Sequence, residues 1–310
     1  RTNPSRDRTS GRHSRDMRYP PRNDGSGGRV TMSNDVMKSG NVAVVTGGAA
    51  GIGLAAAQRF AKRGMTVVVV DVRGELFPEA EASLREAGAP EVMTRAVDVA
   101  NRAAVDAFRD EVIAAYGHID LLMCNAGIQP GSDIFDSKQT WARVLEVNLW
   151  GVVNCCQSIV PGMIERGRPA IVINTGSKQG ITTPPGNPAY NVSKAGVKAA
   201  TEALQHELRN TEGCKISAHL LVPGFVYTGM VRQFLPEKPE SAWLPEQVVE
   251  FLVDALDRGD FYVICPDNDV SRAEDNKRMA WAMGDIIENR PPLSRWHPDF
   301  QGAFESYMKE

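Results

Sequence analysis

The chain has 310 residues, of which 42% are hydrophobic and 24% charged, and its net charge at pH 7 is −3. This is an ordinary globular composition, enough for one large domain or two small ones. No run of 18 or more apolar residues occurs, so the sequence predicts neither a transmembrane helix nor a membrane partner.

The five cysteines (Cys124, Cys155, Cys156, Cys214, Cys265) are odd in number and lack CxxC spacing. They are typical of reduced core thiols in an intracellular protein, and argue against a disulfide framework or a zinc site. The adjacent pair at 155–156 could form a redox pair, although burial as small hydrophobes is favoured. We therefore expect a cytoplasmic protein without a metal.

The charge is unevenly distributed along the chain. Residues 1–29 contain eight Arg and three Asp, which gives this segment a net charge of +5 and leaves −8 for the remainder. Such a polar segment has little to bury, and we predict a disordered basic arm over residues 1–40. A transit peptide or a nucleic-acid-binding tail are the alternatives. Interspersed acids argue against the first, and the lack of RNA-binding aromatic patterns argues against the second.

From residue 41 onward, short apolar runs alternate with amphipathic stretches. The runs predict seven strands, at 41–47, 65–72, 91–99, 118–127, 170–177, 215–224 and 260–265. The stretches between them predict helices, at 52–64, 78–88, 103–117, 138–167, from about 190 to 211, and at 245–259. This alternation predicts a single α/β domain over 41–265, a doubly wound parallel sheet of the Rossmann type. The carboxyl ends of its strands should share one edge, where ligands bind.

The first predicted strand ends in "TGGAAGIG", residues 46–53. Glycines at 47, 51 and 53 allow a tight turn and close approach to a phosphate, and the helix that opens there offers free N–H groups. The position of the loop between a predicted strand and a predicted helix supports a dinucleotide-binding role. A tight turn without a ligand is the alternative.

An acidic residue, Asp71, ends the second strand, 20 positions after Gly51. A carboxylate here accepts hydrogen bonds from ribose hydroxyls and repels a 2′-phosphate, which favours NAD. Arg73 could instead accept that phosphate, so NADP remains the alternative cofactor. Asp98, after the third strand, could contact adenine or cap a helix.

Six motifs in register resemble the short-chain dehydrogenase/reductase family. They are "TGGAAGIG", "NAG" at 125–127, Asn148, Ser177, "YNVSK" at 190–194 and "PGFVYT" at 223–228. The resemblance spans residues 41 to about 265 and implies a Rossmann domain, usually in a homodimer or homotetramer, that transfers hydride between an alcohol or ketone and a nicotinamide cofactor. Two departures are "NTGS" in place of a double serine, and "CPDN" where many relatives have a glycine turn.

The resemblance also implies the site residues. The catalytic tetrad would be Asn148, Ser177, Tyr190 and Lys194. Cofactor contacts would come from Gly47, Gly51, Ile52, Gly53, Asp71, Asp98, Val99, Asn125, Ala126, Gly127, Tyr190, Lys194, Pro223, Gly224, Val226 and Thr228.

Chemically, oxidation of an alcohol requires a base for its hydroxyl proton. Tyr190 and Lys194 are four residues apart and share one helix face. We expect Lys194 and the oxidised nicotinamide ring to lower the pKa of Tyr190 from about 10. Ser177 would hold the substrate oxygen. Asn148 would bend its helix around a water that relays protons to Lys194, although a satisfied core asparagine is the alternative.

The substrate pocket is expected from 128–130, 179–187 and 225–244. The last segment is largely apolar, which favours a hydrophobic secondary alcohol or ketone, or else a loop that only covers the cofactor. Residues 266–310 predict a helical extension that packs on a neighbouring subunit or, as the alternative, caps the pocket. A catalytically silent dinucleotide sensor or scaffold is the alternative function.

Overall fold

The computed structural model describes residues 32–232 and 235–310, and all of its elements belong to one compact unit. A parallel seven-stranded sheet forms its centre, in the order β3-β2-β1-β4-β5-β6-β7. The strands are β1 (Val42–Thr46), β2 (Thr66–Asp71), β3 (Val92–Ala96), β4 (Leu121–Cys124), β5 (Ala170–Thr175), β6 (Ile216–Val222) and β7 (Tyr262–Ile264). The predicted doubly wound sheet is confirmed.

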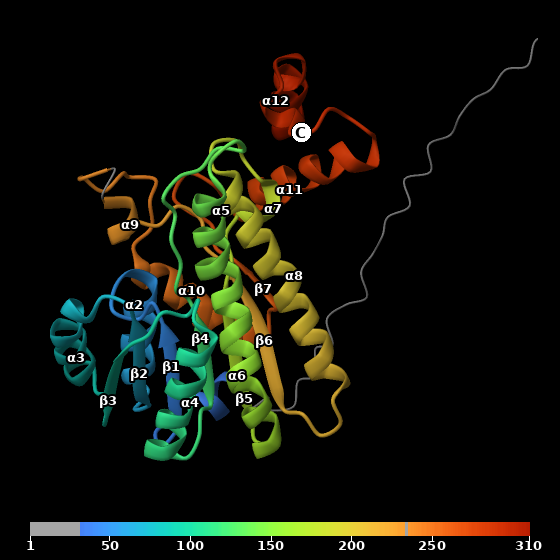
Figure 1. Ribbon diagram of the computed structural model, residues 1–310. Helices are drawn as coiled ribbons and strands as arrows, with labels where there is room; N and C mark the ends of the chain where they lie inside the picture. The colour runs from blue at the N-terminus through green and yellow to red at the C-terminus, as the bar shows by residue number, and fades with distance from the viewer. Residues whose placement is uncertain (1–31, 233–234) are drawn as a thin grey trace, which may run out of the picture. The chain divides into compact units, whose positions relative to one another are not determined.

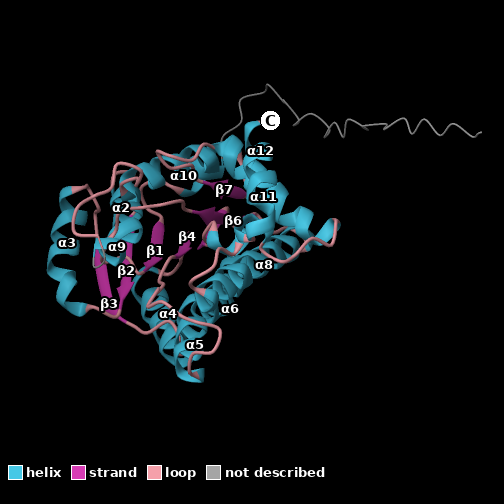
Figure 2. Ribbon diagram, turned by 90° about the horizontal axis from the view of Figure 1, so that it is seen from above, coloured by secondary structure: helices cyan, strands magenta, loops and turns pink. Residues whose placement is uncertain are grey.

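Helices cover both faces of this sheet (Figure 1, Figure 2). The structure has α1 (Met32–Val36), α2 (Gly51–Ala61), α3 (Phe77–Glu86), α4 (Arg102–Tyr116), α5 (Lys138–Leu145), α6 (Gly151–Arg166), α7 (Gln179–Thr182), α8 (Pro188–Asn210), α9 (Gly229–Arg232), α10 (Pro245–Arg258), α11 (Arg272–Ile287) and α12 (Gln301–Lys309). Short 3-10 turns lie at η1 (Gly74–Leu76), η3 (Ser294–Trp296) and η4 (Pro298–Phe300). Helices α1, α2 and α10 pack together, whereas α4, α6 and α8 lie on the opposite face.

The side chains of each strand alternate between two hydrophobic cores, as a sheet buried on both faces requires. In β1, Ala43 and Val45 join the core under α2 and α10, whereas Val42 and Val44 join the core under α4, α6 and α8. This two-sided burial explains why the strands are continuous apolar runs in the sequence.

The order in which successive strands are added to the sheet reverses between β1 and β4, although all strands run parallel. Strands β2 and β3 lie on one side of β1, and β4 to β7 lie on the other. At such a switch point the loops after the two central strands diverge and leave a crevice at the carboxyl edge. The segments after Thr46 and Cys124 meet at this edge.

Among the residues that the structure describes, one helical stretch, Lys138–Arg166, is long and apolar enough by length and composition to cross a membrane. In the structure 56% of the most apolar part of this stretch is buried, and the stretch packs against α4 and α8. Its middle is the π-helical segment η2 (Glu146–Trp150). The stretch is therefore placed as a core helix that covers the sheet.

Ordered structure begins earlier than the sequence predicted. Residues 32–40, predicted to be disordered, include helix α1, and the side chains of Val36 and Met37 are buried against the domain. The prediction of disorder failed there because a five-residue helix carries too short a pattern to detect. The remainder of the predicted arm, residues 1–31, lies outside the described residues.

The C-terminal extension folds around Trp281. Its indole Nε1 donates a hydrogen bond to Ser294 Oγ at 2.8 Å, and the Arg290 guanidinium lies 4.1 Å from its ring centroid. The rings of Phe304 and Tyr307 each lie 5.3 Å from the Trp281 ring. Helix α11 contacts α7, which places the extension against the same chain's sheet edge.

Candidate active site

The glycine loop joins β1 to α2, and its backbone segments lie close to one another. Gly47 and Gly51 have φ values of 61° and 56°, which favour glycine. A Cβ built on Gly53 would lie 2.1 Å from the Gly47 carbonyl oxygen, so a side chain does not fit there. Helix α2 begins at Gly51 without a side-chain cap. The first N–H groups of α2 are therefore not used by a side-chain cap, an arrangement that suits a phosphate.

Thr46 ties this loop to the end of β4. Its Oγ1 accepts hydrogen bonds from the backbone N–H of Asn125 at 3.0 Å and of Ala126 at 3.1 Å. The Asn125 side chain donates in turn to the Gly47 carbonyl oxygen at 3.2 Å. The "NAG" segment thus fixes the glycine loop across the switch point.

The acidic residue after β2 is buried and already engaged. Asp71 has a side chain only 4% exposed, and both its oxygens accept hydrogen bonds at 3.1 Å from the Arg73 guanidinium, which is 48% exposed. Its Oδ2 also faces the Ala49 N–H of the glycine loop at 3.4 Å. The hydrogen bond and the charge of Asp71 raise the pKa of Arg73, although partial burial opposes this effect.

Asp98 and Val99 follow β3 at the same edge. Asp98 accepts from the Ala100 N–H at 3.0 Å and pairs with Arg143 at 3.1 Å. Val99 is buried, and a Cβ on Gly151 would lie 2.6 Å from its side chain. Asn101, not Asp98, caps α4, so the capping alternative for Asp98 is wrong; Asp98 forms a turn before the helix, and its second oxygen is held by Arg143.

The four residues of the expected tetrad converge beside Gly127. Lys194 Nζ donates to the Thr175 carbonyl oxygen at 2.8 Å and lies 5.7 Å from the Tyr190 ring centroid. A Cβ placed on Gly127 would lie 3.4 Å from Asn148 Oδ1 and 3.6 Å from Lys194 Nζ. The side chains of Ser177 and Tyr190 are hydrogen-bonded to each other.

Asn148 occupies the π-helical segment, where an extra residue widens the helical turn. Its Oδ1 accepts from the Ile128 N–H at 2.8 Å, and its Nδ2 donates to the Ile128 carbonyl at 2.9 Å and to Ser193 Oγ at 3.2 Å. Both donors of the amide are therefore used within the chain. The expected irregularity of this helix is present, and the amide braces the loop that follows β4.

Burial shifts the pKa values of two residues at this site. Burial raises the pKa of Tyr190, and the hydrogen bond from Ser177 opposes this only in part. Burial also lowers the pKa of Lys194 to about 8. In the chain by itself burial dominates the pKa of Tyr190, and the lowering expected from Lys194 together with the oxidised nicotinamide ring stays a prediction.

The "PGFVYT" segment closes the far side of the crevice. The Thr228 side chain lies 3.4 Å from a Cβ placed on Gly51, which brings the segment to the glycine loop. Val226 is buried and forms a β-bridge with Trp243. Trp243 packs against Phe251 of α10 at 6.0 Å. The sequence predicts that Trp243 lines the substrate pocket. In the structure its side chain instead packs in part against the core.

Sequence analysis missed an ion cluster behind Gly224. Lys178 Nζ lies 2.7 Å from Asp275 Oδ2 and 3.4 Å from Asp267 Oδ2. A Cβ on Gly224 would lie 2.7 Å from the Asp267 carboxylate. The one signal in the sequence was "CPDN", noted as a departure at the end of the last strand, because it contains Asp267.

Metal ligands are lacking in the part of the chain that the structure describes, where no group of three or more His, Cys, Asp or Glu side chains could hold an ion. The five cysteines are free.

A doubly wound sheet with a glycine loop, an acidic residue after β2 and a Tyr–Lys helix defines a dinucleotide-binding protein of the Rossmann class. The sequence profile of the short chain dehydrogenases matches residues 41–239. The chain belongs to this family and is an oxidoreductase by that membership.

Relatives with known names cover most of the chain. A 1-deoxy-11-beta-hydroxypentalenate dehydrogenase of Streptomyces exfoliatus is 32% identical over 260 residues, which are 82% of this chain and 93% of that protein. FabG of Thermotoga maritima, a 3-oxoacyl-acyl-carrier-protein reductase, is 35% identical over 230 residues, 69% of this chain and 89% of the relative.

Solved structures show the same fold. A short chain dehydrogenase/reductase from Burkholderia phymatum in complex with NAD has a TM-score of 0.73 and 30% identity, covering 82% of this chain and 96% of that one. A metagenomic short-chain oxidoreductase in complex with NADP has a TM-score of 0.62 and 28% identity, and the match covers 74% of this chain and 98% of that one. Relatives thus bind either nicotinamide cofactor.

Proposed function

We propose that the protein is an NAD-dependent dehydrogenase or reductase of a secondary alcohol or ketone, with Tyr190 as the general acid and base. The observation that carries the proposal is the convergence of Tyr190, Ser177 and Lys194 at the carboxyl edge of the sheet. A silent sensor on this fold would not need a buried lysine beside a hydrogen-bonded serine and tyrosine, since burying an ammonium costs free energy.

The residues of the crevice fit a dinucleotide. The close backbone of Gly47 and Gly53 would approach the pyrophosphate, and the buried carboxylate of Asp71 would accept the ribose hydroxyls. When bound, the nicotinamide accepts or donates the hydride, and its oxidised ring carries a positive charge that favours the tyrosinate.

Each tetrad residue has a separate proposed role. Tyr190 would take the hydroxyl proton during oxidation and return it during reduction. Ser177 would donate a hydrogen bond to the substrate oxygen and stabilise the charge that develops on it. Lys194, held by the Thr175 carbonyl, keeps two ammonium hydrogens free for the cofactor ribose and for proton transfer.

Asn148 would act as a positioning residue. Its amide fixes the backbone at Ile128, directly after the "NAG" segment. The water relay expected from Asn148 to Lys194 stays a prediction. So does the hydrophobic substrate, for which the support is the apolar composition of the segment after Gly224.

The choice of NAD rests on the charge of Asp71. A 2′-phosphate beside this carboxylate would bring a second negative charge, and repulsion between them would disfavour NADP. Arg73 would favour NADP, because a guanidinium can bind the 2′-phosphate, but both Asp71 oxygens already hold this guanidinium.

The test of this function is Tyr190→Phe. We expect kcat to fall by about 10²–10⁴-fold, the usual contribution of a positioned acid or base. NADH formation from a panel of secondary alcohols measures turnover, and fluorescence titration measures NAD binding, which should persist. Tyr116→Phe, at the end of α4, is the matched control and should keep full activity. Near-normal turnover in Tyr190→Phe contradicts the assignment, and the absence of turnover in the native chain with every alcohol tested favours the silent sensor.

A further inference from the structure

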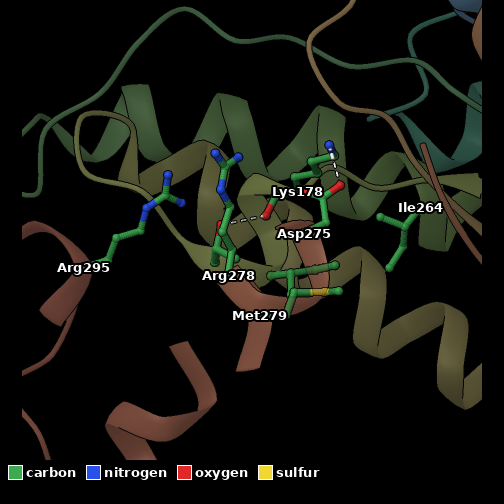
Figure 3. Close-up of a pocket in the computed structure, with 8 residues that line it drawn as sticks. Lys178, Ile264, Asp275, Arg278, Met279 and Arg295 are labelled. Carbon is green, nitrogen blue, oxygen red and sulfur yellow. Dashed lines mark hydrogen bonds and ion pairs between the residues drawn. The ribbon is translucent and has the colours of Figure 1, made fainter. Parts of the chain in front are cut away.

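A small pocket lies between α7 and α11, on the side of α7 that faces the C-terminal extension (Figure 3). It is lined by Lys178, Ile181, Thr182, Ile264, Asp275, Arg278, Met279 and Arg295. Its volume of about 70 Å³ exceeds the roughly 10–15 Å³ that one water occupies on this measure. The pocket therefore has room for a group of the size of a carboxylate or a phosphate.

Two arginines bring positive charge to this pocket. Arg278 comes from α11 and Arg295 from η3, and Figure 3 shows both side chains at the same wall. Among the residues that the structure describes, neither guanidinium has a carboxylate within ion-pair distance. Arg278 Nε is buried and lacks a hydrogen-bond partner in the same part of the chain. A buried donor without a partner is costly, so an acceptor placed in the pocket would stabilise Arg278.

The position of Arg295 is set by aromatic rings. Its guanidinium carbon lies 4.8 Å from the Trp296 ring centroid and 5.1 Å from that of Phe304. Stacking of this kind fixes the plane of a guanidinium while leaving its N–H edge available for hydrogen bonds. Arg295 is thus held in place by groups that do not neutralise it.

The carboxylates near the arginines are engaged elsewhere. Asp275 pairs with Lys178 at 2.7 Å (Figure 3). Asp267 approaches the same ammonium at 3.4 Å. Glu274 accepts from the Ser271 N–H at 2.7 Å as part of the helix cap. Burial, and next the charge of Arg278, lower the pKa of Arg295, while Asp275 opposes this effect. The two guanidinium groups therefore repel each other.

We propose that this pocket binds an oxyanion, a carboxylate or phosphate group, through Arg278 and Arg295. Planar guanidinium groups match the oxygen pairs of such groups, and a bound anion would supply the acceptor that Arg278 Nε lacks. Its negative charge would also relieve the repulsion between the two arginines. The anion is either free in solution or the charged end of a substrate.

The site adjoins the candidate active site. Lys178 follows Ser177 directly, and α7 begins at the next residue, so one wall of the pocket is continuous with the residue proposed to hold the substrate oxygen. An occupied pocket would join α11 to α7 more firmly. The existence of the site does not depend on the proposed function, because binding can be measured without turnover.

The test uses the full chain and inorganic phosphate. The unfolding temperature is followed against phosphate concentration at constant ionic strength, balanced with sodium chloride. We expect a saturable rise for the native chain. Arg278→Gln and Arg295→Gln should each weaken phosphate binding by about tenfold or more, since each removes a charge-assisted contact. Arg272→Gln, an exposed arginine at the start of α11, is the matched control and should bind like the native chain.

A charge-retaining variant covers the case in which the glutamine variants do not fold. Arg278→Lys keeps the positive charge but loses the planar fork, and should bind phosphate less tightly than the native chain and Arg272→Gln. Equal phosphate affinity in the native chain and in every folded pocket variant overturns the proposal. The absence of a saturable response in the native chain also overturns it.

Two matched ketones then identify the source of the anion. One ketone ends in a carboxylate and the other in the corresponding neutral methyl amide, and the two are otherwise identical. If the pocket holds the end of a substrate, Arg278→Gln raises KM about tenfold or more for the carboxylate alone, and phosphate competes with that ketone. If it holds a free anion, phosphate changes the reduction rate of the neutral ketone in the native chain but not in Arg278→Gln. Either result supports the site.

Discussion

The charge on Lys194 depends on its burial. Burial lowers its pKa from 10.5 to about 8 in the folded chain, whereas the unfolded chain keeps the ordinary value. Between about pH 8 and 10.5 the unfolded state thus binds more protons, and the folded state gains stability as the pH rises. At about 1.4 kcal/mol per pKa unit, the gain across this window is about 3 kcal/mol.

This effect is measurable against Lys194→Met, which has no titrating group at this position. Urea unfolding at pH 7.5, 9 and 10.5 should show the stability of the native chain rising relative to the variant, by up to about 3 kcal/mol. Comparing the two proteins cancels the titration of all other groups. Parallel pH profiles would show that Lys194 is not held in a desolvated site.

We expect Asp71 and Arg73 to act as a pair in the choice of cofactor. Asp71→Asn removes the negative charge and releases the Arg73 guanidinium, which then faces a 2′-phosphate without competition. We expect the ratio of kcat/KM for NADP over NAD to rise about tenfold or more, the effect of about one charge-assisted contact. Adding Arg73→Gln to Asp71→Asn should lower the ratio again. A native chain that prefers NADP would contradict the role given to Asp71.

At the scale of elements, the strand–turn–helix unit of β1 and α2 tolerates no side chain at Gly53. Gly53→Ala would place a methyl group 2.1 Å from the Gly47 carbonyl oxygen, so the loop backbone must move. Dinucleotide binding should fall by about tenfold or more, as a bound phosphate loses backbone contacts of more than about 1.4 kcal/mol.

Gly162→Ala is the matched control for this substitution. Gly162 lies inside α6, and a Cβ built there meets nothing within 4 Å. Alanine is a better helix former than glycine by about 1 kcal/mol, so this variant should be slightly more stable and bind NAD normally. Titration calorimetry with NAD compares the two variants. Equal affinity in both would remove the glycine loop from the proposed cofactor site.

The π-helical segment is another feature at this scale. The sequence indicated that a polar residue interrupts a long apolar helix, and Asn148 lies within the irregular turn. Sequence patterns could not identify its partner, because the amide contacts Ile128, 20 residues away and across a loop. The irregularity was thus predictable, but the brace it provides was not.

At the scale of the whole molecule, the C-terminal extension presents apolar side chains to solvent. Ile286 and Ile287 on α11 are 77% and 76% exposed, and Met283 is 54% exposed. The expectation that the extension packs on a neighbouring subunit, in a homodimer or homotetramer, stays a prediction. Exposed aliphatic side chains in one helix are consistent with such packing.

We expect the double variant Ile286→Glu with Ile287→Glu to lower the oligomeric state, because charged side chains would enter an apolar interface. Sedimentation equilibrium measures the effect. Ile113→Glu, on the exposed side of α4, is the control and should leave the mass unchanged. An unaltered mass in the double variant would place any subunit interface elsewhere.

The sequence by itself determined the sheet, the glycine loop and the spacing of Tyr190 and Lys194, because periodic burial and local backbone geometry leave a pattern along the chain. Only the tertiary structure decided which charged groups meet and how burial shifts their pKa values. Lys178 meets Asp267 across 89 positions, and the contact follows no periodic pattern. In the chain by itself the pKa of Tyr190 likewise rises, because desolvation depends on everything packed around the phenol and not on its helical neighbour alone.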